Sequence, residues 1–212
     1  MKIFIDSADV NEIKQAVEMG LCDGVTTNPT LIAKTGKKNA DVIKAICGIT
    51  DAPVNAETVG ISYDEIVAEG TELRKIAPNV VVKIPMCKDG LRAVRYFAAR
   101  DIASTVTLIF NASQALLAAK AGASFIAPFV GRLDDQSETG MEMISEIVEI
   151  YDSYDFDTEV VVASVRSPLH VKDAALAGAH AVTVPFSLLD KLMAHPLTEL
   201  GIAKFLADAG RK

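Results

Sequence analysis

The chain has 212 residues, of which 50% are hydrophobic and 23% charged, with 13 glycines and 8 prolines. This composition is typical of globular proteins and excludes the disordered, collagen-like and low-complexity classes. The formal net charge of −7 at pH 7 argues against a general basic surface for nucleic acid or anionic membranes, so any anionic ligand needs a locally positive site.

Cysteine and histidine placement indicates no metal site. Cys22, Cys47 and Cys87 form no CxxC pair, and the three histidines share no ligand spacing with them. The first apolar run ends at Asp6, which is too short for a signal peptide, and no segment approaches the roughly 18 apolar residues that a membrane-spanning helix needs. We therefore expect a cytoplasmic protein without metal, disulfide or membrane contact.

Short β-branched runs alternate with helical patterns along the whole chain. The predicted strands cover residues 2–6, 24–27, 53–59, 80–86, 102–110, 124–130, 158–165 and 180–186. The predicted helices cover 10–20, 28–36, 62–77, 88–100, 111–122, 137–154, 167–178, 187–194 and 197–210, with a polar loop before the helix at 137–154.

Eight strand–helix units of about 26 residues each leave no room for a second domain, and (β/α)8 barrels can be as short as about 200 residues. Continuous apolar strands such as 80–85 suit a parallel sheet buried on both faces. The rival, a doubly wound open sheet, normally has a glycine-rich turn after its first strand, whereas residues 6–9 contain no glycine. The sequence predicts one (β/α)8 barrel domain over 1–212 with an extra C-terminal helix.

Polar residues at the predicted helix starts support this register. Their side chains are suited to accept hydrogen bonds from the first free backbone N–H groups of a helix. The predicted N-caps are Ser7, Asn28, Asn111, Ser137 and Ser187.

Lys83 lies inside the apolar strand at 80–85. A lysine is rarely buried without a partner. An inward-facing amine would lose its water shell, which favours the neutral, nucleophilic form that can attack a carbonyl to form a Schiff base. The alternatives are a side chain that reaches out to solvent or one half of a structural ion pair.

Other polar residues lie at the carboxyl ends of predicted strands, where barrels place their active sites. Asp6 and Glu57 could form an acid/base set with Lys83. The alternatives are that Asp6 caps a helix or pairs with Lys83, and that Glu57 is a solvated loop charge. Asn28 and Thr107 could hold a substrate hydroxyl or a water, although Asn28 is equally suited to cap a helix. The remaining candidates at strand ends include Thr26, Thr27 and Phe129.

A positive site is predicted at the ends of the sixth and seventh strands. Arg132, Ser164 and Arg166 would offer charge-assisted contacts to a phosphate group. The alternative is that both arginines pair with the nearby Asp134 and Asp135.

Four segments, FIDSADVNEIK, GVTTNPTLI, VVVKIPM and IAPFVGRLDD, resemble the transaldolase family in its short single-domain branch, which includes fructose-6-phosphate aldolases. The resemblance covers essentially the whole chain. It implies a (β/α)8 barrel, Schiff-base chemistry without metal or organic cofactor, and a place in carbohydrate metabolism (the pentose phosphate pathway). It also implies cytoplasmic homo-oligomers, pentamers or decamers.

The resemblance assigns a role to each reactive residue. Lys83 matches the Schiff-base lysine, Asp6 the acid/base aspartate, and Asn28 the asparagine that contacts the bound intermediate. Glu57 matches a glutamate that, with Asp6 and Thr107, orders the catalytic water.

The resemblance also assigns the phosphate contacts. Arg132 and Ser164 match phosphate-binding positions, and Arg166 stands where the family has Arg or Lys. Gly131 replaces an asparagine found in some relatives, so the shape of this loop is not implied by the resemblance.

Two positions favour transfer over simple cleavage. Aldolases of the branch carry glutamine where this chain has Glu57 and tyrosine where it has Phe129. We therefore expect a transaldolase that moves a dihydroxyacetone unit from sedoheptulose 7-phosphate or fructose 6-phosphate to glyceraldehyde 3-phosphate or erythrose 4-phosphate. A fructose-6-phosphate aldolase and a non-catalytic barrel that binds sugar phosphates remain alternatives.

Overall fold

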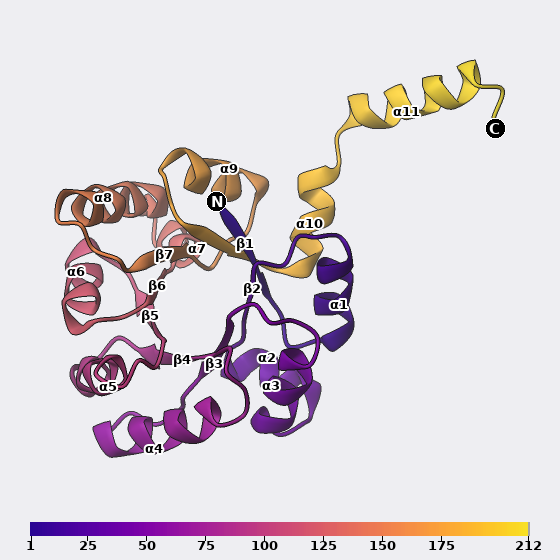
Figure 1. The fold of residues 1–212 in the computed structure, drawn as a ribbon. Coiled ribbons are helices and arrows are strands. Elements are labelled where there is room, and N and C mark those ends of the chain that lie inside the picture. The colour runs from indigo at the N-terminus through magenta and orange to yellow at the C-terminus, as the bar shows by residue number, and fades with distance from the viewer. Residues whose placement is uncertain (212) are drawn as a thin grey trace.

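The computed structural model describes residues 1–211 and contains a closed barrel of eight parallel strands (Figure 1). The strands are β1 (Lys2–Asp6), β2 (Gly24–Thr26), β3 (Val54–Glu57), β4 (Val80–Pro85), β5 (Ser104–Ile109), β6 (Phe125–Pro128), β7 (Glu159–Val162) and β8 (Ala181–Val184). They pair in chain order, and β1 also pairs with β8 in parallel register. The predicted (β/α)8 barrel is confirmed and the open sheet is wrong.

Helices follow the strands, and all but the last of them surround the barrel (Figure 1). They are α1 (Val10–Glu18), α2 (Pro29–Thr35), α3 (Asn39–Cys47), α4 (Tyr63–Arg74), α5 (Lys88–Ala98), α6 (Ala112–Ala121), α7 (Val130–Asp134), α8 (Gly140–Ser153), α9 (Pro168–Leu176), α10 (Phe186–Met193) and α11 (Pro196–Asp208). The sequence predicted neither α3 nor α7; α7 begins just before the segment expected to be a polar loop and covers part of it.

The hydrophobic core has two parts, as alternation along β1 illustrates. Ile5 faces outward and is fully buried in the core beneath the helices, whereas Phe4 faces into the barrel and packs with Val161, Ala181 and Phe125. A Cβ at position 24 would lie 2.6 Å from the Phe4 ring, so glycine is needed there to make room for it. Phe4 and its neighbours thus fill the barrel interior below Asp6, and the cavity lies above them.

Two of the five predicted helix caps are correct. Asn28 accepts a hydrogen bond from the backbone N–H of Leu31, and Asn111 from that of Gln114. The predicted caps that the structure contradicts are Ser7, Ser137 and Ser187. The α1 cap is Asp9, two residues after Ser7; α8 and α10 begin after Thr139 and Pro185 without a side-chain cap.

Helix α11 extends away from the barrel (Figure 1). None of its residues is buried, although it carries Leu197, Leu200, Ile202 and Phe205, all more than half exposed. Within residues 1–211, no helix is both long and apolar enough to cross a membrane.

Candidate active site

Lys83 is buried in the barrel interior near the carboxyl end of β4, with 4% of its surface exposed. Its Nζ donates a hydrogen bond to the carbonyl oxygen of Thr27 at 2.9 Å and lies 3.0 Å from Oε2 of Glu57. The lysine therefore does not reach out to bulk solvent. It is paired with a carboxylate, and both side chains line one cavity of about 450 Å³.

Strand register places this pair. Glu57 is the β3 partner of Lys83 on β4, and adjacent residues in parallel strands point to the same face of the sheet. Because Thr27 directly follows β2, its carbonyl meets the amine from the next strand. Three consecutive strands thus hold the Lys83 side chain in one orientation.

Asp6 lies at the end of β1 on the wall of the same cavity. Thr26 donates a hydrogen bond to its Oδ1 at 2.8 Å, and the Thr26 hydroxyl lies 2.6 Å from that of Thr183. Burial raises the pKa of the Asp6 carboxyl, while the positive charge of Lys83 and the Thr26 hydrogen bond pull the pKa down again. A carboxyl with a raised pKa is suited to exchange protons nearer neutral pH.

Asn55 lies buried below the Lys83–Glu57 pair and was not singled out from the sequence. Its amide nitrogen donates to the carbonyl of Val25 at 3.1 Å, and its carbonyl oxygen accepts from the hydroxyl of Thr105. It therefore ties β3 to β2 and β5 beneath the cavity. A polar residue inside an otherwise apolar strand was the available sequence signal.

Two sequence-predicted residues lie behind the cavity surface. The hydroxyl of Thr27 donates to the carbonyl of Asn55 at 2.8 Å. Thr107 is buried, and its hydroxyl has no hydrogen-bond partner among the described residues. Buried hydroxyls without a partner are uncommon and are often satisfied by an ordered water. Thr107 is thus suited to hold the catalytic water that the family resemblance assigns to it.

Asn28 has two roles that the sequence left as alternatives. Its side-chain oxygen caps α2, accepting from Leu31 at 3.0 Å, and the residue also lines the cavity beside Glu57. Because the cap uses only the oxygen, the side-chain amide N–H groups are available to a ligand.

The positive end of the cavity lies between α7 and the end of β7. Arg132, Ser164 and Arg166 all line it, as predicted from the sequence. The guanidinium of Arg132 lies over the Phe129 ring, 4.6 Å from its centroid. Arg166 instead pairs with Asp135, with Nη2 and Oδ2 2.6 Å apart.

The alternative given for the two arginines, a pairing with nearby acids, therefore holds for Arg166, on the exposed rim. Arg166 also holds the pKa of the Asp135 carboxyl below its usual value. Asp134 contacts His170 at 2.9 Å rather than an arginine.

Gly131 brings the start of α7 close to Ser164. Its N–H donates to the Ser164 carbonyl at 3.1 Å, and a Cβ at this position would lie 2.2 Å from the same oxygen. Ser164 itself has a left-handed backbone with φ of +59°. The shape of this loop thus depends on glycine at position 131.

With this geometry described, we compared the chain with known proteins. Residues 3–210 match the family model described as Transaldolase/Fructose-6-phosphate aldolase. The chain belongs to this family. Relatives with the name "Probable transaldolase" include those of Citrifermentans bemidjiense, 55% identical over 98% of this chain and 97% of the relative. Another, from Methanococcus maripaludis, is 56% identical over the same shares of the two chains.

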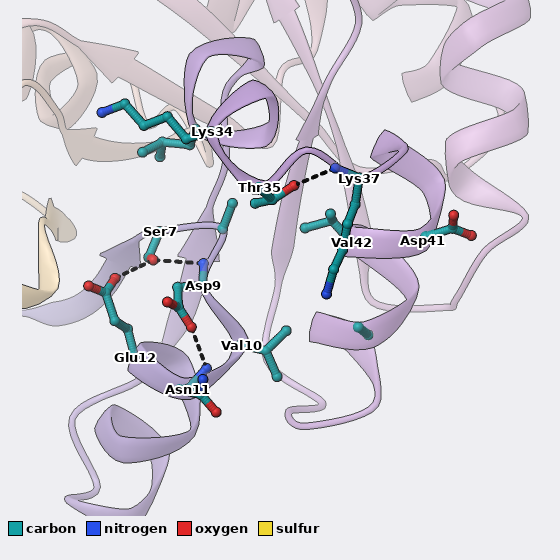
Figure 2. A pocket seen from close by; sticks show the side chains of 13 residues that line it. Ser7, Asp9, Val10, Asn11, Glu12, Lys34, Thr35, Lys37, Asp41 and Val42 are labelled. Carbon is teal, nitrogen blue, oxygen red and sulfur yellow. Dashed lines mark hydrogen bonds between the residues drawn. The ribbon is translucent and has the colours of Figure 1, made fainter.

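Membership of the transaldolase/fructose-6-phosphate aldolase family directs attention to the cavity around Lys83 rather than to a second one outside it. Figure 2 shows this second cavity, of about 540 Å³, lined by residues of α1, α2 and α3 and of the segments before α1 and after α2. Some of its polar groups bond to one another: Ser7 with Glu12, and Thr35 with the backbone of Lys37. No group of three or more His, Cys, Asp or Glu side chains placed to hold a metal occurs within residues 1–211.

Proposed function

We propose that the protein is a transaldolase that moves a three-carbon dihydroxyacetone unit between sugar phosphates through a Schiff base on Lys83. The observation that supports it most is the burial of the Lys83 amine 3.0 Å from Glu57, in one cavity with Asp6 and two arginines. Family membership and the probable transaldolases at 55–56% identity support the same activity.

In the proposed reaction, Glu57 takes a proton from Lys83, and the neutral amine attacks C2 of fructose 6-phosphate or sedoheptulose 7-phosphate. The carbinolamine loses its hydroxyl as water, protonated from the water held by Glu57 and Thr107. Asp6 then takes the proton of the C4 hydroxyl, the C3–C4 bond breaks, and its electron pair enters the enamine. Asn28 donates a hydrogen bond to the fragment that stays on Lys83.

The same steps in reverse transfer the fragment. The enamine carbon attacks the carbonyl carbon of glyceraldehyde 3-phosphate or erythrose 4-phosphate, Asp6 returns its proton to the new hydroxyl, and water hydrolyses the imine. Arg132, Ser164 and Arg166 hold the phosphate at the far end, so remote binding energy orients the reacting carbons. For Arg166 this contact requires an exchange of partner from Asp135.

Phe129 favours transfer over the alternative, fructose-6-phosphate aldolase activity. Its ring lines the cavity and has no hydroxyl that could donate a proton to the enamine. In the same position, the fructose-6-phosphate aldolases that the chain resembles carry a tyrosine. Glu57 in place of their glutamine adds a charged partner for Lys83.

We also propose that the chain forms homo-oligomers, with one barrel domain per chain, in the cytoplasm. The exposed apolar residues of α11 support self-association. The resemblance supports pentamers or decamers.

The test is a coupled assay of glyceraldehyde 3-phosphate release from fructose 6-phosphate, with and without erythrose 4-phosphate. Release that depends on the acceptor is the expected result. Equal release without it indicates an aldolase, and no release supports a non-catalytic sugar-phosphate-binding barrel.

A matched pair of lysine variants tests the Schiff base. Lys83→Met should abolish trapping of fructose 6-phosphate by borohydride, because no amine remains in the cavity. Lys88→Met removes an exposed lysine outside the cavity and should trap substrate as the parent does. Continued trapping in Lys83→Met would refute the assignment.

A further inference from the structure

Strand β5 contains an irregularity directly beside the candidate catalytic groups. Thr107 pairs with Ala127 of β6 and Ile109 pairs with Pro128, so Leu108 is one extra residue in β5. Its φ of +61° is a left-handed conformation that bulky side chains rarely adopt. Such β-bulges re-aim side chains and are common next to active sites.

The bulge changes the face toward which Leu108 points. With regular alternation, the residue after Thr107 would join the outer core, as Val106 and Ile109 do. Leu108 instead lines the cavity of Lys83 and is only partly buried. It belongs to neither hydrophobic cluster of the described residues, so core packing does not offset its strain. Strain of this kind is retained mainly where function requires it.

Leu108 completes an apolar wall of the cavity. Ala127 and Phe129, from the end of β6, line the cavity beside it. In the closed strand order, β5 and β6 lie opposite β1 and β2, which lead to Asp6 and Asn28. A substrate fragment on Lys83 therefore has the hydrogen-bonding groups of Asp6 and Asn28 on one side, and on the other an apolar patch made of Leu108, Ala127 and Phe129.

We propose that Leu108 is a specificity-determining residue that shields the enamine carbon of the Lys83-bound fragment from water. This inference rests on the transaldolase function proposed above. In transfer, that carbon forms a bond to the aldehyde carbon, whose oxygen takes a proton. In release without acceptor, the same carbon takes a proton from water, hydroxide adds to C2, and the C2–Nζ bond breaks to give dihydroxyacetone and the free amine.

Both routes end in hydrolysis of an imine, so they differ only in what reaches the enamine carbon. A hydrocarbon wall that excludes water slows proton transfer from water to the enamine carbon. It does not hinder the attack of that carbon on the carbonyl carbon of the acceptor aldehyde. The isobutyl group of Leu108 supplies such a wall, and a smaller side chain leaves room for water there.

The experiment compares Leu108→Ala with the parent in the coupled assay. We expect the ratio of glyceraldehyde 3-phosphate release without acceptor to that with acceptor to rise about tenfold, the usual scale for opening an apolar pocket. Borohydride trapping should persist, because Lys83 and Glu57 are unchanged. Leu108→Met, which keeps the volume, should retain the parent ratio.

Two glycine variants separate the effect of the Leu108 side chain from the effect of the strained backbone. Leu108→Gly removes both the side chain and the strain and should raise the ratio as Leu108→Ala does, which also covers the case in which Leu108→Ala folds poorly. Asp101 has a similar φ of +55° in an exposed turn outside the cavity lining. Asp101→Gly should therefore keep the parent ratio.

The outcomes distinguish the two proposals. An unchanged ratio in Leu108→Ala and Leu108→Gly, or an equal rise in Leu108→Met, overturns the role of Leu108 alone, provided that the parent transfers the fragment. A parent that forms no reducible imine overturns the transaldolase function and this inference together.

Discussion

At the scale of single residues, the raised pKa of Asp6 has opposite consequences for stability and for reactivity. A carboxyl whose pKa is higher in the folded chain stabilises the fold most at low pH, and this contribution is lost as the pH rises through the folded-state pKa. At neutral pH the ionised Asp6 therefore lowers the free energy of unfolding, and the proposed reaction needs Asp6 in this ionised form.

Asp6→Asn should raise the free energy of unfolding at about pH 7 by about 0.5–2 kcal/mol, the usual range for stabilising substitutions, while it abolishes cleavage. The gain over the parent should shrink toward about pH 4, where the parent carboxyl is increasingly protonated. Urea unfolding at several pH values measures it. A gain that is independent of pH would show that the charge of Asp6 is not its cause.

In the parent, the same raised pKa sets the acid side of the activity profile. As the proposed base in cleavage, Asp6 must be ionised, so kcat/KM should fall as the pH drops through a value above the 3.8 usual for an aspartate. A pH–rate series with fructose 6-phosphate and acceptor tests this, with circular dichroism to confirm that the chain stays folded. Full activity down to the usual aspartate pKa would contradict the assignment.

The strain at Leu108 has its own consequence for stability. The free energy of unfolding of Leu108→Gly should lie within about 1 kcal/mol of the parent's. Relief of the left-handed strain offsets the lost contacts and the greater freedom of glycine in the unfolded chain. Val106→Gly, two residues earlier and fully buried in the outer core, should cost about 2–5 kcal/mol. Equal losses for the two variants would show that Leu108 is an ordinary packing residue.

The sequence is informative about Lys83, since a charged residue in an apolar strand has few structural explanations. It is silent about Leu108, because a leucine in a β-branched run looks like core, and only the pairing with β6 reveals the extra residue. Asn55 was missed for a related reason, since its two partners come from other strands.

At the scale of elements, the strand pattern was sufficient to locate all eight strands, whereas the helix pattern missed two helices. Every predicted strand forms, although several end earlier than expected: Val130 and Phe186, expected in strands, begin α7 and α10. Helix α3 was missed because one helix was assigned to each strand, although Val42, Ile43 and Ile46 form a buried stripe. Helix α7, with five residues, is too short for periodicity to identify.

The close approach of α7 to β7 yields a prediction. Gly131→Ala places a methyl group against the Ser164 carbonyl and should displace Arg132 and Ser164, raising KM for phosphorylated substrates about tenfold and costing about 1–3 kcal/mol of stability. Steady-state kinetics with fructose 6-phosphate and thermal unfolding measure the two effects. Gly201→Ala is the control, since open space surrounds Gly201 in α11. An unchanged KM in Gly131→Ala would mean that the loop adapts without moving the phosphate contacts.

At the scale of the molecule, barrel closure was predictable from eight strand–helix units, but the position of α11 was not. Its sequence is equally compatible with packing on its own barrel or on another chain. The structure shows that it does not cover its own barrel. A helix of 13 residues is marginal in water without packing partners, so another copy of the chain is the expected partner.

Light scattering tests this proposal. The parent should have a mass that is a multiple of 22.6 kDa, and the double variant Leu200→Ser with Phe205→Ser should dissociate toward single chains because two exposed apolar groups are lost. Lys204→Ala, a polar change on the same helix, should leave the assembly intact. A parent that is already a single chain at micromolar concentration would contradict the proposal.

The strand order also divides the cavity between the two halves of the chain. Asp6, Glu57 and Lys83 all precede α5, whereas Phe129 and Arg132 follow it. The proposed Schiff-base lysine and acid/base carboxyls are therefore encoded in the first half of the gene, and the residues at the positive end of the cavity, together with Thr107, in the second half; an exposed turn at Arg100 and Asp101 joins the two halves. Recombination at that turn would exchange one half for that of a relative in a single event, and Glu57 and Phe129, the two residues proposed to favour transfer, would be inherited independently.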